Sequence, residues 1–168
     1  MNYLLETPNL ILRKLQLSDA SFMLELLNTP LWLKFIGDRG VKSIEDAEKY
    51  LLNGSLKSYD EKGFGFYCVE EKFSKKAIGM CGYVKRDELE DVDFGFAFLP
   101  EFIRKGYGYE IAKPTLDFGK TNLKFKRITA IVNPENIPSN NLLKKLGFVF
   151  EKTIEFGETK VVLNLYGV

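Results

Sequence analysis

The chain of 168 residues contains no histidine and only two cysteines, Cys68 and Cys81. Without histidine there is no Ser–His or Cys–His catalytic pair, and the commonest protein metal ligand is missing. Any proton transfer must therefore use a carboxylate, hydroxyl, amine, thiol or water. The cysteines lie in separate apolar segments and form no Cys-x-x-Cys pair, so we expect buried thiols and no metal site.

Long apolar runs and an excess of one charge are also missing. No segment approaches the roughly 20 apolar residues of a membrane-spanning helix, and residues 1–10 lack the basic start and apolar core of a signal peptide. Lys and Arg number 24 against 23 Asp and Glu, which gives a formal net charge of +1. We therefore expect a cytoplasmic protein that binds neither a membrane nor nucleic acid, although the basic segment 120–127 leaves a nucleic-acid-binding domain as a third-ranked alternative.

The composition is that of a folded protein, with 45% hydrophobic and 28% charged residues. The length favours one domain over residues 1–168. Strands and helices alternate irregularly, and most neighbouring strands are joined as hairpins, which predicts a mixed α+β sheet with helices on its faces. Strands are expected at 10–15, 64–69, 77–84, 92–99, 127–132, 148–153 and 159–166, helices at 18–28, 43–56, 107–120 and 140–146, and irregular chain at 31–40.

A glycine-containing basic loop follows one of these strands. The alternating Phe94, Phe96 and Phe98 end at Pro100, and the sequence Arg-Lys-Gly-Tyr-Gly at 104–108 then leads into a helical pattern. A loop of this kind presents backbone N–H groups to a phosphate at a helix N-terminus. The Walker A and Gly-x-Gly-x-x-Gly patterns are both absent, so a simple turn before a helix remains the alternative.

Three spaced segments together carry a family resemblance. They are LPEFIRKGYGYE at 99–110, NPENIPSNNLLKKLGF at 133–148, and the opening ETPNLILRKLQLSDA at 6–20. The combination resembles the GNAT superfamily of N-acetyltransferases, closest to the branch of ribosomal-protein N-terminal acetyltransferases of the RimJ/RimL type. The resemblance implies a mostly antiparallel sheet of about seven strands with helices on both faces, splayed between strands 92–99 and 127–132.

The resemblance also implies a binding site for acetyl-CoA as co-substrate. Loop amides would hold its pyrophosphate, the backbone of the splayed strand would pair with the pantetheine arm, and Asn136 would contact that arm from the far side. Ile103 stands where the family usually has Gln or Arg, which weakens the match little because backbone groups do most of the binding. The cofactor-binding residues implied are Phe96, Ala97, Phe98, Arg104, Lys105, Gly106, Tyr107, Gly108, Tyr109, Asn136 and Ser139.

The catalytic groups are less sharply defined. Ser139 matches a family serine that could protonate the departing thiolate, or it could simply cap the following helix. Leu143 stands where many family members have a tyrosine that acts as the general acid. Asp93 occupies the position of a frequent family glutamate and is a candidate base through water, with Glu101 as the other candidate.

The activity implied is direct acetyl transfer from acetyl-CoA to a primary amine, either a protein N-terminus or a small amine. A CoA-binding module with little or no activity is the alternative, because the usual tyrosine and any histidine are missing. Trp32, Phe35 and Tyr50 could line the acceptor's entrance, and the protein could be a monomer or a homodimer. Pro114 is expected to kink or shorten the helix after the glycine loop.

Overall fold

The computed structural model describes residues 2–168 and contains one eight-stranded sheet in the order β1-β2-β3-β4-β5-β6-β8-β7. All neighbouring pairs are antiparallel except β5 and β6. The mixed sheet agrees with the expected fold class, and the eighth strand is the two-residue β1. The strands are β1 Leu5–Glu6, β2 Leu10–Lys14, β3 Phe66–Glu71, β4 Ala77–Val84, β5 Val92–Phe98, β6 Ile128–Val132, β7 Val149–Phe156 and β8 Val161–Gly167.

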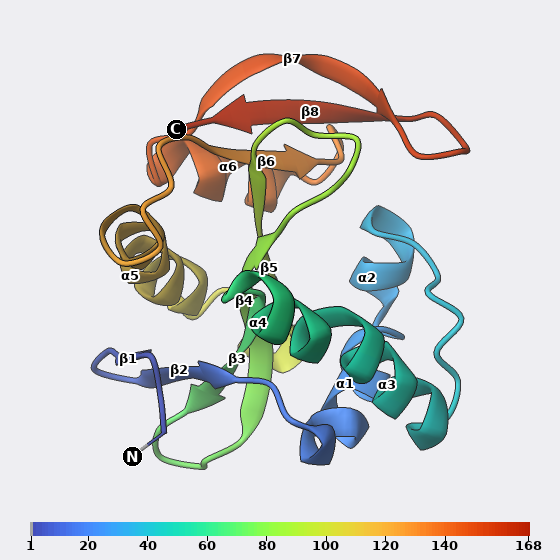
Figure 1. The fold of residues 1–168 in the computed structure, drawn as a ribbon, viewed down its shortest axis with the longest axis vertical. Coiled ribbons are helices and arrows are strands. Elements are labelled where there is room, and N and C mark those ends of the chain that lie inside the picture. Colours follow the sequence, from blue (N-terminus) through green and yellow to red (C-terminus); the bar gives the residue numbers. More distant parts are fainter. Residues whose placement is uncertain (1) are drawn as a thin grey trace.

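Helices cover both faces of this sheet, as predicted. One apolar core joins the sheet to α5 and α6, and a second core joins the opposite face to α1, α2 and α3. In Figure 1, β6 to β8 lie at the top of the view and α1, α3 and α4 lie below them. The helices are α1 Ala20–Leu26, α2 Pro30–Phe35, α3 Ile44–Leu51, α4 Lys57–Lys62, α5 Tyr107–Thr121 and α6 Ile137–Lys145, with short helical turns at Leu17–Asp19, Leu52–Leu56 and Pro100–Phe102.

Helix α2 replaces part of the segment expected to be irregular. The Thr29 side chain accepts a hydrogen bond from the Trp32 amide at 3.3 Å, and Pro30 occupies the first turn. These residues act as an N-cap and an N1 proline, which are helix-starting roles. The preceding helix does end before these residues, at Leu26, but the expectation of irregular chain was wrong for residues 31–35, which are helical.

Two other local expectations concern a cap and a proline. Ser43, the first residue of the helix expected at 43–56, caps α3, because its hydroxyl accepts the Asp46 N–H at 3.0 Å. Helix α5 continues through Pro114 to Thr121 and is not shortened. Its first turn, which follows the glycine loop, is intact. No helix in the described part of the chain combines the length and apolarity needed to cross a bilayer.

The two cysteines are buried and unpaired, as predicted. Cys68 and Cys81 are both fully covered in the sheet. Burial raises the pKa of each thiol to about 12, so both are held in the neutral form. Within residues 2–168 no group of three or more His, Cys, Asp or Glu side chains is arranged to hold a metal ion.

Candidate active site

The sheet opens between β5 and β6. These strands pair only through Val92 with Ile128 and Asp93 with Thr129, and the Thr129 hydroxyl donates to the Val92 carbonyl at 2.9 Å. Beyond Asp93, no strand of residues 2–168 pairs with this edge of β5. The splay implied by the family resemblance is therefore present, and it leaves a run of backbone donors and acceptors free for a ligand.

A cavity of about 350 Å³ lies in this opening, and we call it the splay cavity. It is bounded by β5, β6, α2, the start of α6 and the turn between β7 and β8. The structure brings most of the predicted non-loop residues to its wall, whereas Phe98 and the loop residues 104–109 lie outside it. The predicted residues on its wall are Asp93, Phe96, Ala97, Asn136 and Ser139.

Asp93 is the buried carboxylate of the splay cavity, with 3% of its surface exposed. Arg86 donates its Nε hydrogen to Asp93 Oδ2 at 2.8 Å. Burial raises the pKa of Asp93 to about 6, and the Arg86 charge only partly opposes that rise. A carboxyl group with a pKa near neutrality is suited to accept a proton from a reacting group.

Two buried polar atoms on this wall have no hydrogen-bond partner among residues 2–168. They are Asp93 Oδ1 and Trp32 Nε1, and both residues line the splay cavity. Buried polar groups in folded proteins are nearly always bonded, so each exception requires an explanation. One acceptor and one donor left open in the same cavity are consistent with a site that a polar ligand completes.

The glycine loop has the backbone geometry of an anion site. Arg104 and Gly106 both adopt left-handed conformations, with φ of +66° and +79°. The amide N–H groups from Arg104 to Tyr109 bond to no backbone acceptor elsewhere in residues 2–168, and α5 has no side-chain cap. Left-handed residues within a loop turn successive N–H groups toward one point, and the helix dipole adds positive potential there.

Side chains on three other elements hold this loop in place. Tyr107 donates its hydroxyl hydrogen to Glu71 at 2.9 Å, which ties the loop to β3. The Glu110 carboxylate accepts the backbone and side-chain N–H groups of Asn9 at 2.9 and 3.0 Å. A Cβ atom on Gly108 would lie 3.0 Å from the Leu142 side chain, so α5 and α6 approach closely here.

The start of α6 differs from the prediction. The helix begins at Ile137, and Asn136 is its N-cap, with its side chain accepting the Ser139 N–H at 3.4 Å. Ser139 therefore does not cap the helix. No hydrogen bond within residues 2–168 uses the Ser139 hydroxyl, which leaves it free at the cavity wall.

Asn140, which the sequence analysis did not single out, fixes this corner. Its amide nitrogen donates to the carbonyls of Asn133 and Asn136, at 3.0 and 2.8 Å. Its oxygen accepts from Asn164 and from the Tyr166 hydroxyl. The β6–α6 loop, α6 and β8 are thereby held together by one buried side chain, and the position of Ser139 follows from that connection.

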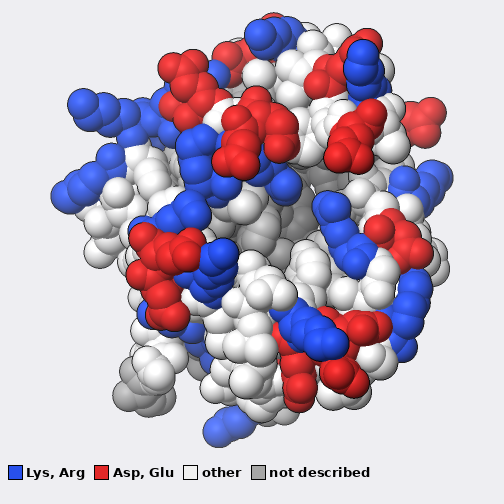
Figure 2. All heavy atoms as spheres, turned by 45° about the vertical axis from the view of Figure 1, so that its right-hand side comes forward, with Lys and Arg blue, Asp and Glu red and all other residues white. Residues whose placement is uncertain are grey.

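A second cavity, of about 710 Å³, adjoins the first, and we call it the large cavity. Figure 2 shows the hollow on this face, with Lys and Arg side chains at its border. Tyr50 lies between the cavities, while Trp32 and Phe35 line only the splay cavity. Five residues line both cavities and mark the passage from one to the other: Arg39, Tyr50, Phe66, Met80 and Arg86.

Two of these passage residues escaped the sequence analysis. Arg39 lies in the segment expected to be irregular, and Arg86 lies two residues after the strand expected at 77–84. The structure places both guanidinium groups at the opening of the splay cavity. Glu101, by contrast, is exposed on the turn after β5 and lines neither cavity, so its position offers no support for a base there.

Comparison with known proteins identifies the class. A family model described as an acetyltransferase (GNAT) domain matches residues 9–149. The uncharacterized N-acetyltransferase YoaA of Bacillus subtilis is 29% identical over 146 residues, covering 86% of this chain and 82% of that protein. Spermidine N(1)-acetyltransferase of Escherichia coli K12 is 24% identical over 140 residues, covering 83% and 73%.

A solved structure shows the same fold. The RimL ribosomal L7/L12 α-N-protein acetyltransferase, determined in complex with coenzyme A, superimposes with a TM-score of 0.85 at 15% identity, over 99% of this chain and 97% of that one. The open, splayed sheet is thus that of an acetyltransferase. The chain belongs to the GNAT acetyltransferase family, and it resembles the RimJ/RimL branch.

Proposed function

We propose that this protein transfers an acetyl group from acetyl-CoA directly to a primary amine, either a protein N-terminus or a small amine. The observation that carries the proposal is the unpaired edge of β5 from Phe94 to Phe98. That edge runs toward the loop whose amides, from Arg104 to Tyr109, are unbonded. A strand edge followed by an anion-binding loop fits a long ligand with an amide-containing arm and a pyrophosphate.

The binding roles follow from these free groups. The amides of Arg104 to Tyr109 hold the pyrophosphate, and Gly106 lets it approach because no side chain stands there. The backbone at Phe96, Ala97 and Phe98 pairs with the pantetheine arm and fixes the thioester next to the splay cavity. Asn136 closes the arm from the β6 side, since it lies at that wall. These residues supply orientation, which converts a two-molecule reaction into one within a complex.

Backbone N–H groups of β5 act on the acetyl group itself. An N–H aimed at the thioester oxygen stabilises the negative charge that develops there as the amine attacks. The amine nitrogen forms a bond to the acetyl carbon, and the carbon–sulfur bond then breaks. The amine loses one proton, which Asp93 accepts through water, and the departing sulfur gains one, which Ser139 donates.

A CoA-binding module without efficient catalysis remains the second candidate, favoured by Leu143 at the position of the usual tyrosine. The deciding experiment measures thiol release from acetyl-CoA with a panel of small amines and peptide N-termini. Acetylation of one acceptor class at more than background rate supports the enzyme. Tight CoA binding with no turnover on any amine supports the binding module, and no binding of CoA contradicts both candidates.

A further inference from the structure

Positive charge dominates the large cavity. Asp46 and Glu61 are the two carboxylates on its wall. The basic residues that line it are Arg39, Lys49, Lys57, Lys62, Lys85 and Arg86. A cationic ligand is repelled by such a surface, whereas an anionic ligand is attracted to it and associates faster.

Both carboxylates already have neighbouring donors. Asp46 Oδ2 accepts the Lys42 N–H at 3.0 Å, near the start of α3. Glu61 lies 3.8 Å from Lys57 Nζ and 3.9 Å from Lys62 Nζ. These contacts partly offset the negative charge of both groups.

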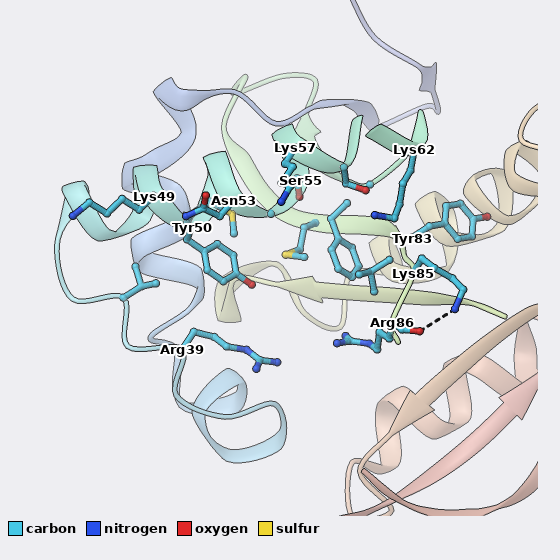
Figure 3. A pocket seen from close by; sticks show the side chains of 18 of the residues that line it. Arg39, Lys49, Tyr50, Asn53, Ser55, Lys57, Lys62, Tyr83, Lys85 and Arg86 are labelled. Carbon is cyan, nitrogen blue, oxygen red and sulfur yellow. Dashed lines mark hydrogen bonds between the residues drawn. The ribbon is translucent and has the colours of Figure 1, made fainter. Parts of the chain in front are cut away.

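Most of the basic groups are also paired, and Arg39 is the exception. Lys49 lies 3.3 Å from Glu45, Lys57 and Lys62 flank Glu61, and Arg86 binds Asp93. Arg39 forms no ion pair with any carboxylate of residues 2–168. Figure 3 shows Arg39 and Arg86 pointing toward one another beside Tyr50, with Lys62 reaching from α4 toward the middle of the cavity. Lys85 instead turns to the Arg86 carbonyl at 2.9 Å. Asp93 engages Arg86, so Arg39 is the guanidinium left without a carboxylate at the passage.

Tyr50 lies near both guanidinium groups. The fields of Arg39 and Arg86 favour the ionised form of Tyr50, although burial has the larger, opposite effect and raises its pKa. Tyr50 lines both cavities. A ligand that passes Tyr50 therefore has Arg39 and Arg86 beside it.

We propose that the acceptor is a small amine whose other end carries a carboxylate or phosphate group, and that Arg39 binds this anion at the passage while Lys62 assists from the large cavity. This inference rests on the proposed function. The amine end enters the splay cavity beside Asp93, and the anionic end stays in the large cavity, whose volume of about 710 Å³ leaves room for it. A polycation such as spermidine, the acceptor named for one relative, meets like charge here.

The first experiment compares acceptors that differ only at the far end. The series 4-aminobutyrate, butylamine and 1,4-diaminobutane keeps the reacting amine and changes the distal charge, and phosphoethanolamine against ethanolamine repeats the comparison for phosphate. Peptides with acidic and with basic residues near a free N-terminus separate a small-molecule source of carboxylate from a peptide. We expect kcat/KM to fall at least tenfold from anionic to cationic acceptor. Equal or better use of 1,4-diaminobutane or spermidine overturns the inference, and so does a preference for acidic peptides over every small anionic amine.

The second experiment removes the charge of Arg39. We expect Arg39→Gln to raise the KM for 4-aminobutyrate or phosphoethanolamine about tenfold, while the KM values for butylamine and acetyl-CoA stay unchanged. Lys34→Gln is the matched control, because Lys34 is an exposed cation on neighbouring α2 that lines neither cavity. An equal effect of both variants, or an equal effect on charged and neutral amines, contradicts a specific anion contact at Arg39.

Binding separates failure of this inference from failure of the proposed function. Calorimetry on the CoA complex compares phosphoethanolamine with ethanolamine in the wild type and in Arg39→Gln, without requiring turnover. Tighter binding of the phosphate compound that is lost in the variant supports the anion site even if no amine is acetylated. Equal binding of both compounds overturns it even if acetyl transfer to other amines proceeds.

Discussion

Arg86 Nε and Asp93 Oδ2 lie 2.8 Å apart where β5 leaves β6. The pair combines residues from the two ends of the β4–β5 connection, and it places an arginine and a largely buried carboxylate at one opening. Burial raises the pKa of Asp93, and the positive charge of Arg86 limits that rise. The result is a group that changes charge close to physiological pH.

The Asp93→Asn variant tests the proposed base. An amide keeps the shape and the bond from Arg86 but cannot accept a proton. We expect kcat to fall on the order of a hundredfold, with little change in the KM for acetyl-CoA. In the wild type, kcat/KM should rise with pH through about 6, because Asp93 must be ionised to act, and that acidic limb should vanish in the variant. An acidic limb that persists at the same pH assigns the base to another group.

The same carboxyl should leave a signature in stability. Its pKa is raised in the folded protein to about 6, against an ordinary value of 3.8. Between these values the folded chain holds a proton that the unfolded chain has lost, so this group's contribution to stability falls as pH rises through the window and is constant above it. The wild type minus Asp93→Asn difference in unfolding free energy should decline on the order of 2 kcal/mol from pH 4 to pH 7, by urea denaturation. A difference that grows with pH contradicts the raised pKa.

The strand with its three phenylalanines and the glycine loop could be predicted from local sequence patterns. Alternating Phe94, Phe96 and Phe98 define a strand on their own, and Gly106 after basic residues defines a loop before a helix. These features depend on neighbours within a few residues, so a single sequence is enough to read them. The family resemblance assigned Asp93 and Asn136 to one site, and both residues line the splay cavity.

The passage between the cavities could not be read in this way. Arg39 and Arg86 are 47 positions apart in the sequence and line one passage only because α2, α3 and β4 fold around it. Thr29-Pro30 is compatible with both the end of one helix and the start of the next. The next helix, α2, does start here, and it packs Trp32 into the second core. Contacts across the fold, not local propensity, decided both cases.

Valine variants of Gly106 and Gly63 distinguish an effect of backbone strain from an effect on phosphate binding. Gly106 and Gly63 have nearly the same left-handed φ, +79° and +78°, and a Cβ on either would meet nothing within 4 Å. Valine at either position should therefore cost about 1–2 kcal/mol of stability. Only Gly106→Val should also weaken CoA binding, by about tenfold or more, because only Gly106 lies among the unbonded amides.

Thermal unfolding measures the loss of stability in Gly106→Val and Gly63→Val, and titration with CoA measures the loss of affinity. Gly63 ends α4 and lines neither cavity, so its variant carries the strain alone. Unchanged CoA affinity in Gly106→Val, with the expected loss of stability, would remove the glycine loop from the proposed binding site. Equal loss of affinity in both variants would attribute the effect to general destabilisation.

Alanine variants of Asn136 and Ser139 should have different effects, because Asn136 caps a helix and Ser139 is the proposed proton donor. Asn136 caps α6, so Asn136→Ala should lower stability by about 1 kcal/mol.

The Ser139 hydroxyl holds no hydrogen bond within residues 2–168, so Ser139→Ala should leave the melting temperature almost unchanged. If Ser139 protonates the departing thiolate, Ser139→Ala lowers kcat at least tenfold, with the KM for acetyl-CoA preserved, and Ser139→Thr restores part of the rate. A kcat equal to the wild type in Ser139→Ala contradicts Ser139 as the proton donor and leaves that role to water or to another hydroxyl on the cavity wall, Tyr50 or Thr159.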